Sequence, residues 1–444
     1  MSSVYTPVDA AKKALKEERE TPIERRLNRV GKRVASWWGP IVVLDFVIGL
    51  SLTFVGYNVT GSVPGGVLTA AFIVLVGLGR PSLVRVRWGG LLLLVMFAVL
   101  IFLAVESRYN GMRWVQRDTK FLLILLACAV IASGRINIRS VIIGGMVGSL
   151  VNVPMFYAGL TDNMYPPYLT GFYLDKNVAG MYYALWGCLG LVVLPKRWRK
   201  WWIVLTFGLL FLTGSRTSMA AYLMGLAWMF MRPRTGIVFR IVVGGLGFWA
   251  LNWFIESLAH SKIFGDRTGD DWFRQQIEMA MTAKTHVTPW YGLGLNQGFV
   301  LLGGVRSAYF HNSYQQTFVE GGWPFLLTVI IAFVIIGLGI FDRRVQIPPV
   351  LLRLEGAVIV LLICAWKLGE VFMTLGAFLL LGMCLAHRFG VKHDPYERTA
   401  NPLQQVKSRE LLQAEARERQ LDNTSHSEEE RTPLQQEQDA NVPV

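Results

Sequence analysis

Cysteine is scarce in this sequence, with four residues in a chain of 444. All four lie within long apolar runs, at Cys128, Cys188, Cys364 and Cys384. Free cysteine commonly behaves as a small buried hydrophobe, so this placement predicts inert thiols and argues against a disulfide framework or a thiolate metal site. Paired carboxylates and the His/Cys/Asp spacings of metal sites are missing too. We therefore expect neither a metal ion nor another cofactor.

Charged residues are also few, at 17% of the chain, whereas 53% of it is hydrophobic. Soluble domains are usually about 45 to 50% apolar. A bilayer core about 30 Å thick needs roughly 20 apolar residues per helix, and runs of that kind recur along the chain. They lack the period-two alternation of a membrane barrel. We therefore expect an all-α polytopic membrane protein with about twelve transmembrane helices, because helices satisfy their own backbone in lipid.

Nucleotide-binding motifs are missing as well. We find no Walker loop, which argues against ATP-driven transport. The glycines of residues 291–298 resemble a dinucleotide fingerprint, but no strand precedes them, so we interpret them as backbone turns. The net charge of +14 does not indicate a nucleic-acid partner, because the basic residues are scattered through short loops between apolar runs. We interpret the charge as information about topology.

The distribution of Lys and Arg over the loops predicts which loops face the cytoplasm. Arg-rich and Arg-poor loops alternate, and the clearest cytoplasmic marker is the basic run 196–200. This alternation places both termini in the cytoplasm and the long polar segment 257–322 outside. The first 36 residues are polar and basic without a short apolar core, so we expect no cleavable signal peptide. The expected spans are 38–56, 65–79, 89–105, 121–134, 141–160, 178–194, 201–213, 218–231, 237–256, 323–341, 350–366 and 371–386.

Five regions follow from this topology. They are a basic cytoplasmic leader, the first nine transmembrane helices, a large outside helical segment between helices 9 and 10, the last three transmembrane helices, and a cytoplasmic tail. The tail is polar with few apolar residues and is expected to be disordered. The boundaries are 1–36, 37–256, 257–322, 323–388 and 389–444.

The segment 257–322 is the only long polar stretch between two apolar runs, and we expect chemistry on a water-soluble group there. Its pattern predicts a loop, a helix from Asp270 or Asp271, a glycine-rich turn and a second helix that enters span ten. The apolar positions of the first helix suit a helix lying on the membrane surface. Arg267 precedes that helix, where free N–H groups already favour an anion, so this position predicts a phosphate site.

His311 is the candidate general base, because its imidazole titrates near neutral pH. The alternative is a structural histidine in a loop. Asn312 follows it and is a candidate supporting residue. Glu320 either orients His311 or caps the entry to span ten.

Arg216 lies in the tight outside turn of residues 214–217. A charge at the end of a helical hairpin is costly unless it faces a cavity or an anion, although snorkelling to the interface is the alternative. Lys176 and Asn177 begin another span on the same outer side. Arg216, Arg267 and Lys176 could hold a pyrophosphate on this outer side, and His311 could deprotonate a hydroxyl group there.

A second outside loop breaks the positive-inside rule with Arg108, Arg113, Arg117 and Lys120. Positive charge on that side indicates an anionic ligand, and a solvated loop is the alternative. The three arginines are candidate acceptor-binding residues.

Several short motifs occur in a characteristic order over roughly residues 40–388. They are Asp175-Lys176-Asn177, Gly214-Ser215-Arg216-Thr217, Asp266-Arg267 with Trp272, Trp290-Tyr291-Gly292-Leu293-Gly294, and His311-Asn312 with Glu320-Gly321-Gly322. In order and spacing the chain resembles the O-antigen ligase and polymerase superfamily, and most of all its O-antigen ligases. The His-Asn pattern closes at Gly322, but Phe325 stands where the family prefers Gly, Thr or Tyr.

This resemblance implies a GT-C-like glycosyltransferase of lipopolysaccharide biosynthesis in the bacterial inner membrane, with a periplasmic active site. It implies transfer of a glycan from undecaprenyl pyrophosphate to lipid A-core among membrane lipids, without a metal and with inversion. His311 matches the family's proposed base, and Arg216 and Arg267 match its diphosphate-binding arginines. An O-antigen polymerase, a protein O-oligosaccharyltransferase and a non-enzymatic transporter of lipid-linked sugars remain the alternatives.

Overall fold

The computed structural model describes residues 41–58, 63–236, 268–302, 306–342 and 347–392, with isolated positions between 238 and 247. The chain divides into two compact units, Met1–Val391 and Lys392–Val444, and the first holds nearly all of the described residues. The basic leader, Arg267 and the expected disordered tail from residue 393 lie outside the described residues.

The described residues are mostly helical, as the apolar runs predict. In chain order the helices are α3 (Val43–Ser51), α4 (Gly65–Leu78), α5 (Gly89–Tyr109), α6 (Val115–Ala132), α7 (Ile138–Tyr157), α8 (Lys176–Val193), α9 (Lys196–Thr213), α10 (Arg216–Met231), α12 (Thr268–Val287), α13 (Ser313–Ile331), α14 (Pro349–Lys367) and α15 (Leu375–Arg388). Short 3-10 helices η1 (Leu52–Phe54) and η2 (Gly171–Tyr173) and a π-helix η3 (Ala332–Leu338) join them.

Four helical stretches of the described chain are long and apolar enough to cross a membrane. They are α5, α7, α14 and the continuous stretch Ser313–Leu338 formed by α13 and η3. Three further apolar helices are shorter, at Val43–Phe54, Gly65–Leu78 and Leu375–Arg388. The structure thus has the helical, membrane-like character expected from composition, but length and apolarity alone do not establish about twelve spans. Other helices start with charged residues, as α9 does at Lys196 and α10 at Arg216.

The all-helical expectation misses four short strands, β1 (Val84–Val86), β2 (Phe299–Leu302), β3 (Arg306–Tyr309) and β4 (Gly390–Lys392). β1 pairs with β4, and β2 pairs with β3 as an antiparallel hairpin in which Phe299 lies opposite Tyr309. Before this hairpin, Gly292 and Gly294 have φ of 101° and 93°. These angles favour glycine and confirm that the glycines form turns.

The hairpin changes the surroundings expected for the amphipathic helix α12. Its apolar residues Ile277 and Met281 are buried in a cluster that includes Val300, Phe310 and Val319, whereas Met279 of the same helix is exposed. The sequence did not predict this apolar partner, because it did not predict the strands. Lys284 of α12 also donates Nζ hydrogen bonds to the backbone oxygens of Gln297 and Phe299 at 2.8 and 2.9 Å.

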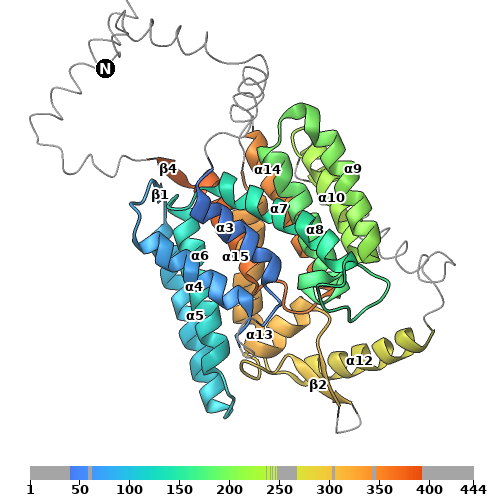
Figure 1. Cartoon of the computed structure of the whole chain (residues 1–444). Coiled ribbons are helices and arrows are strands. Elements are labelled where there is room, and N and C mark those ends of the chain that lie inside the picture. The colour runs from blue at the N-terminus through green and yellow to red at the C-terminus, as the bar shows by residue number, and fades with distance from the viewer. Residues whose placement is uncertain are drawn as a thin grey trace, which may run out of the picture. The chain divides into compact units, whose positions relative to one another are not determined.

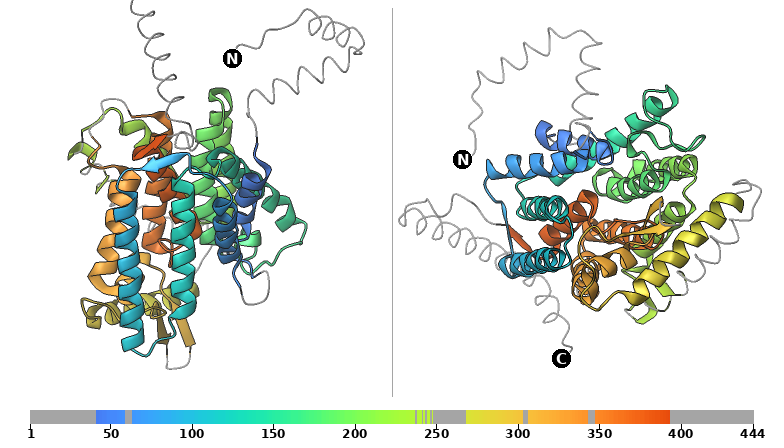
Figure 2. Two further views of the ribbon diagram at one scale, coloured as in Figure 1. Left: turned by 90° about the vertical axis from the view of Figure 1, so that its left-hand side faces the viewer. Right: turned by 90° about the horizontal axis from the view of Figure 1, so that it is seen from below.

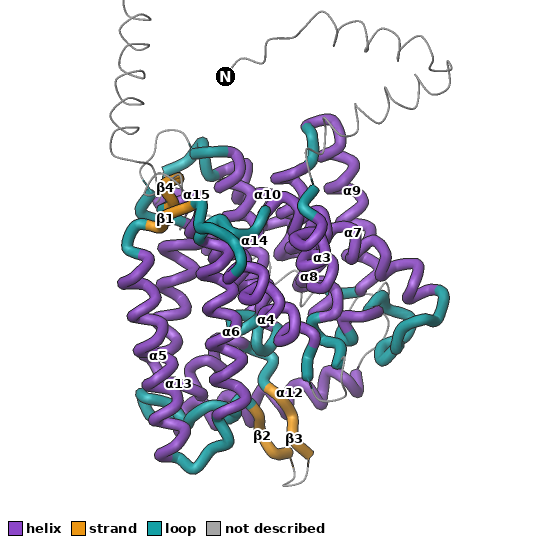
Figure 3. Tube along the Cα trace, turned by 60° about the vertical axis from the view of Figure 1, so that its left-hand side comes forward, coloured by secondary structure: helices purple, strands orange, loops and turns teal. Residues whose placement is uncertain are grey.

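The helices of the first unit have two distinct ends. Figure 1 shows α12 and β2 at one end and the β1–β4 pair at the other. Figures 2 and 3 show the same separation from other sides. α10 packs against α14 in the opposite chain direction, and α8 contacts both. Residues at the starts of α8 and α10 and at the end of α14 meet residues of α12 in one cavity.

Candidate functional site

A cavity of about 190 Å³ lies between α12 and the ends of α8, α10 and α14. Five of the predicted site residues line it: Lys176, Asn177, Arg216, His311 and Asn312. They come from three segments that are far apart in the sequence. The structure therefore brings the candidate base and two candidate phosphate-binding cations to one place.

Three helices begin at this cavity. Lys176 is the first residue of α8, Arg216 is the first residue of α10, and His311 immediately precedes Asn312, the N-cap of α13. The first N–H groups of a helix lack intrahelical acceptors, and the helix dipole puts partial positive charge at the same end. The backbone therefore adds to the positive potential of the side chains.

Lys176 is held in a mostly aromatic setting, with only 6% of its surface exposed. Its Nζ lies 4.9 Å from the ring centre of Tyr168 and 5.6 Å from that of Tyr165. Cation–π attraction offsets part of the cost of burying the ammonium group. Asp175 accepts hydrogen bonds from the backbone N–H groups of Asn177 and Val178 at 2.7 and 3.0 Å, which fixes the start of α8.

The tight turn before α10 positions Arg216. Gly214 has φ of 61°, a left-handed conformation that favours glycine, and a Cβ there would collide with the ring of Tyr168. Ser215 donates its hydroxyl to Asn177 Oδ1 at 3.3 Å. This bond joins the start of α10 to the start of α8, so Arg216 and Lys176 share one rigid support.

The segment after His311 is anchored by hydrogen bonds within the start of α13 and to the loop after α14. Asn312 accepts from the N–H groups of Tyr314 and Gln315 at 3.0 and 3.2 Å as the cap of α13. Ser313 Oγ donates to Leu368 O at 2.6 Å and accepts from Val371 N at 2.9 Å. These bonds fix the start of α13 to the loop after α14. His311 itself is exposed at the edge of the cavity, where a substrate hydroxyl can reach it.

Six residues of the cavity were not among the predicted site residues: Gly214, Thr217, Glu278, Met281, Trp366 and Lys367. Lys367 ends α14 and forms an ion pair with Glu278 of α12 at 3.3 Å. The signal for Lys367 was the same as for Arg216, a cation at the outer end of an apolar run. Glu278 had no comparable signal, because its role depends on how α12 lies against α14.

Glu320 and Arg117 pair with each other. Arg117 Nη2 lies 2.9 Å from Glu320 Oε2, and its Nη1 lies 3.0 Å from Glu370 Oε1, which Lys120 Nζ also contacts at 2.8 Å. Glu320 thus faces Arg117 rather than His311, and Arg117 is turned into the protein. Burial alone would raise the pKa of the Glu370 carboxyl, but the charges of Arg117 and Lys120 outweigh it and hold that pKa below its usual range.

Two of the remaining candidates, Arg108 and Arg113, do not line the cavity. Arg108 lies in the last turn of α5 and Arg113 on the loop between α5 and α6, and both are exposed. The backbone oxygen of Arg113 accepts a hydrogen bond from the side chain of Asn296. Arg267 lies outside the described residues, so its predicted contact with a phosphate stays a prediction.

The glycine of the His-Asn pattern has a structural role. Gly322 breaks α13 with φ of 59°, and a Cβ there would collide with the backbone oxygen of Trp290. Trp323 N donates to that oxygen at 2.8 Å, so the kink ties α13 to the glycine-rich turn. Phe325, which departs from the family pattern, is buried next to Phe121 with ring centres 6.2 Å apart.

No family model matches the chain, and no curated protein matches it either. Functional conclusions therefore depend on the cavity itself. Its lining carries three cations, Lys176, Arg216 and Lys367, against one carboxylate, Glu278. Together with three helix starts, this excess favours an anion with several oxygens, and His311 places a proton acceptor beside it.

Proposed function

We propose that this protein is a glycosyltransferase of the O-antigen ligase type, which moves a glycan from undecaprenyl pyrophosphate to lipid A-core. The observation that carries the proposal is that His311, Arg216 and Lys176 line one cavity although they come from three distant segments. The resemblance of the ordered motifs supports the same reaction. The proposal needs no cofactor, because a diphosphate leaving group is stable once its charge is neutralised.

Arg216 and Lys176 bind the diphosphate in this mechanism. The bond between the anomeric carbon and the phosphate oxygen breaks, and both of its electrons leave with the phosphate. Negative charge therefore grows on the diphosphate as the reaction proceeds, and fixed cations in a poorly hydrated site stabilise that charge by several kcal/mol. The starts of α8 and α10 add N–H dipoles directed at the same group.

His311 accepts the proton of the acceptor hydroxyl as its oxygen attacks the anomeric carbon from the face opposite the diphosphate. The new glycosidic bond then has the inverted configuration. General base catalysis of this kind is typically worth a factor of about 10² to 10⁴ in rate. The anchored start of α13 fixes where the base stands, which is the positioning that such a step needs.

The proposed setting is the bacterial inner membrane, with about twelve spans, both termini in the cytoplasm and the cavity facing the periplasm. The alternation of Arg-rich and Arg-poor loops supports this orientation. Exposed Arg108 and Arg113 are proposed contacts for the phosphates of the acceptor lipid, and Arg267 is a proposed diphosphate ligand. Arg117 is a weaker candidate for the acceptor, because two carboxylates already hold its guanidinium.

The test is glycan transfer to purified lipid A-core by the detergent-solubilised protein in EDTA. We expect product from the parent, and we expect none from a folded His311→Ala variant. His286→Ala is the matched control, because His286 is an exposed histidine of α12 that does not line the cavity. It should keep the parent's activity.

Other outcomes separate the alternatives. Longer glycan on the same lipid carrier, with none on lipid A-core, would replace ligase by polymerase. Glycan on an added acceptor protein would indicate a protein O-oligosaccharyltransferase. Movement of the intact lipid-linked glycan across a vesicle membrane without any transfer would indicate a transporter and exclude a catalytic role for His311.

A further inference from the structure

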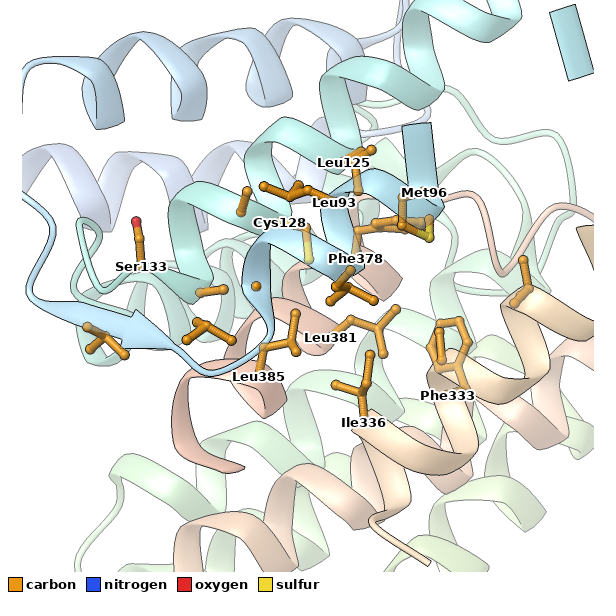
Figure 4. A pocket seen from close by; sticks show the side chains of 18 residues that line it. Leu93, Met96, Leu125, Cys128, Ser133, Phe333, Ile336, Phe378, Leu381 and Leu385 are labelled. Atoms are coloured by element: carbon orange, nitrogen blue, oxygen red, sulfur yellow. The ribbon is translucent and has the colours of Figure 1, made fainter. Parts of the chain in front are cut away.

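A second cavity lies far from His311, near the β1–β4 end of the first unit. Its volume is about 200 Å³, and it lies between α5, α6, η3 and α15, with β1 at one side. Figure 4 shows Leu93, Cys128, Phe333 and Leu381 directed toward this space from different elements. Ser133 is its one polar lining residue among those described, and the Ser133 hydroxyl already donates to Val130 O at 2.8 Å. The lining therefore favours an apolar ligand.

A third cavity, of about 760 Å³, is lined in part by residues that are neighbours in sequence of those lining the apolar cavity. Val86 and Ile336 line the apolar cavity, while Arg87 and Ile335 line the third cavity. The lining of this third cavity includes the charged residues Arg87, Asp342 and Arg388. An apolar space followed directly by a charged one matches an amphiphile with a hydrocarbon chain and an ionic head group.

The charge in the third cavity favours an anionic head group. Arg388 is neutralised by Asp342 at 2.7 Å and by Glu355 at 2.9 Å. Arg87 is exposed, and its guanidinium takes part in none of the ion pairs found among the described residues. Its backbone N–H is held by Phe389 O at 2.9 Å, so the position of Arg87 is fixed at the rim. One cation, on a fixed stretch of backbone, is therefore left for a ligand.

The next residue points to a membrane setting. Trp88 is 75% exposed and begins α5, one of the helices long and apolar enough to span a membrane. Exposed tryptophan is enriched at the head-group level of bilayers, where its ring is apolar and its N–H is polar. Arg87 therefore stands at the depth where a lipid phosphate is found.

We propose that these two cavities form a binding site for one anionic phospholipid of the surrounding membrane. One acyl chain fills the apolar cavity, and the phosphate pairs with Arg87 in the third cavity. Apolar burial supplies most of the binding, and the charge-assisted bond from Arg87 selects an anionic head group. The site lies at the opposite end of the helices from His311 and does not depend on the transferase proposal.

The test uses the full-length protein in phosphatidylcholine vesicles that contain a small fraction of phosphatidylglycerol with a photoreactive group near the end of one acyl chain. Cross-linked peptides are mapped by mass spectrometry. We expect labelling of cavity residues of α6 and α15, such as Ala129 and Leu381. Unlabelled phosphatidylglycerol should compete, and unlabelled phosphatidylcholine should not.

Two pairs of variants separate a built site from lipid that merely surrounds the protein. Arg87→Gln should reduce cavity labelling about tenfold, the effect of losing roughly one charge-assisted bond. Arg85→Gln removes the same charge from a residue that lines neither cavity, and it should leave labelling unchanged. Ala129→Phe should abolish labelling by filling the apolar cavity. Leu94→Phe, on the exposed face of α5, should not.

Three outcomes would overturn the proposal. Labelling spread evenly over the exposed face of α5 would mean bulk lipid only. Equal labelling by a phosphatidylcholine probe, or equal effects of Arg87→Gln and Arg85→Gln, would remove the role of the head group. Labelling unaffected by Ala129→Phe would show that the chain lies elsewhere, including the case in which a segment of this protein fills the cavity.

Discussion

Two charge clusters stand at opposite ends of the same pair of helices, and they differ in kind. α10 begins with Arg216 at the candidate site and ends beside Arg232, roughly 24 Å away at 1.5 Å per residue. α14 runs the other way, with Glu355 near its start and Lys367 at its end, roughly 18 Å apart. Each helix therefore contributes one charged residue to each cluster.

The cluster around Glu355 is closed, in the sense that its cations are paired with carboxylates of the same cluster. Glu355 lies 3.1 Å from Arg232 Nε and 2.9 Å from Arg388 Nη2, and Arg388 also pairs with Asp342 at 2.7 Å. Arg232, Glu355 and Arg388 are all buried. The backbone oxygens of Ile336 and Gly337 accept further bonds from Arg388. Two cations and two carboxylates balance, so the network fixes η3 and α15 to α14 and offers little to a ligand.

The cluster at the candidate site is unbalanced and lines a cavity. Three cations face one carboxylate among its lining residues, and that carboxylate, Glu278, is 62% exposed. Buried charge that is fully compensated commonly serves structure, whereas excess charge of one sign around a cavity is typical of a binding site. The number of charges on these helices therefore does not distinguish a structural cluster from a binding site. The balance of positive and negative charge, and access to a cavity, do.

The largest expected difference between the clusters is in activity. Arg216→Gln should lower the kcat/KM of glycan transfer by a factor of about 10² to 10³, because a fixed donor to the leaving group is lost. Its unfolding temperature in detergent should stay near that of the parent. Transfer assays and thermal unfolding of the same preparations measure both.

Arg234→Gln is the control for this substitution. Arg234 lies just beyond the other end of α10, exposed, with Nη1 donating to Phe230 O at 2.6 Å. Equal loss of transfer in both variants would mean that net charge, and not the position of Arg216, sets the rate, and the contrast between the two ends would fail.

The second expected effect is on stability and belongs to the closed cluster. Glu355→Gln should destabilise the protein by about 3 to 5 kcal/mol, because two buried guanidinium groups lose a shared counter-charge. Glu278→Gln makes the same chemical change in the exposed pair with Lys367 and should cost about 1 kcal/mol or less. Chemical unfolding in mild detergent compares them. Similar destabilisation by the two variants would contradict the distinction between the clusters.

Much of the candidate site was predictable because its residues stand at helix ends. Lys176, Arg216 and His311 each border a long apolar run, and the alternation of basic loops assigns those borders to one side. Residues on one side of a helix bundle share a limited area, so they tend to lie near one another. Topology could therefore bring them together without any knowledge of helix packing.

The contacts that escaped prediction join distant segments. Arg117 and Glu320 are 203 residues apart, and only the packing of α6 against α13 shows that they pair. The β2–β3 hairpin escaped because its strands are four residues each and carry little periodic signal. Because the hairpin was not predicted, its contacts with α12 were not predicted either. The apolar face of that helix fits a membrane surface and a strand pair equally well.

The smallest expected effect concerns Glu370, which supports the candidate site from outside the cavity. Arg117 and Lys120 hold the pKa of its carboxyl below the usual range, so the charged form is favoured in the folded protein. A depressed pKa stabilises the fold above the unfolded pKa of about 4.3, and this contribution is lost as the pH falls through the folded pKa. Because the side chain is 35% exposed, solvent screening limits the effect to about 1 kcal/mol.

Glu370→Gln should therefore lower the unfolding temperature modestly at pH 7, and parent and variant should converge as the pH falls through the depressed pKa that Glu370 has in the folded protein. Thermal unfolding at a series of pH values measures the difference. Glu278→Gln, in the more exposed pair, should show a smaller difference at pH 7. A gap for Glu370→Gln that does not narrow as the pH falls would mean that the carboxylate charge is not what stabilises this loop, because the backbone hydrogen bond from Glu370 N to Gln316 Oε1 at 2.9 Å is present in both proteins.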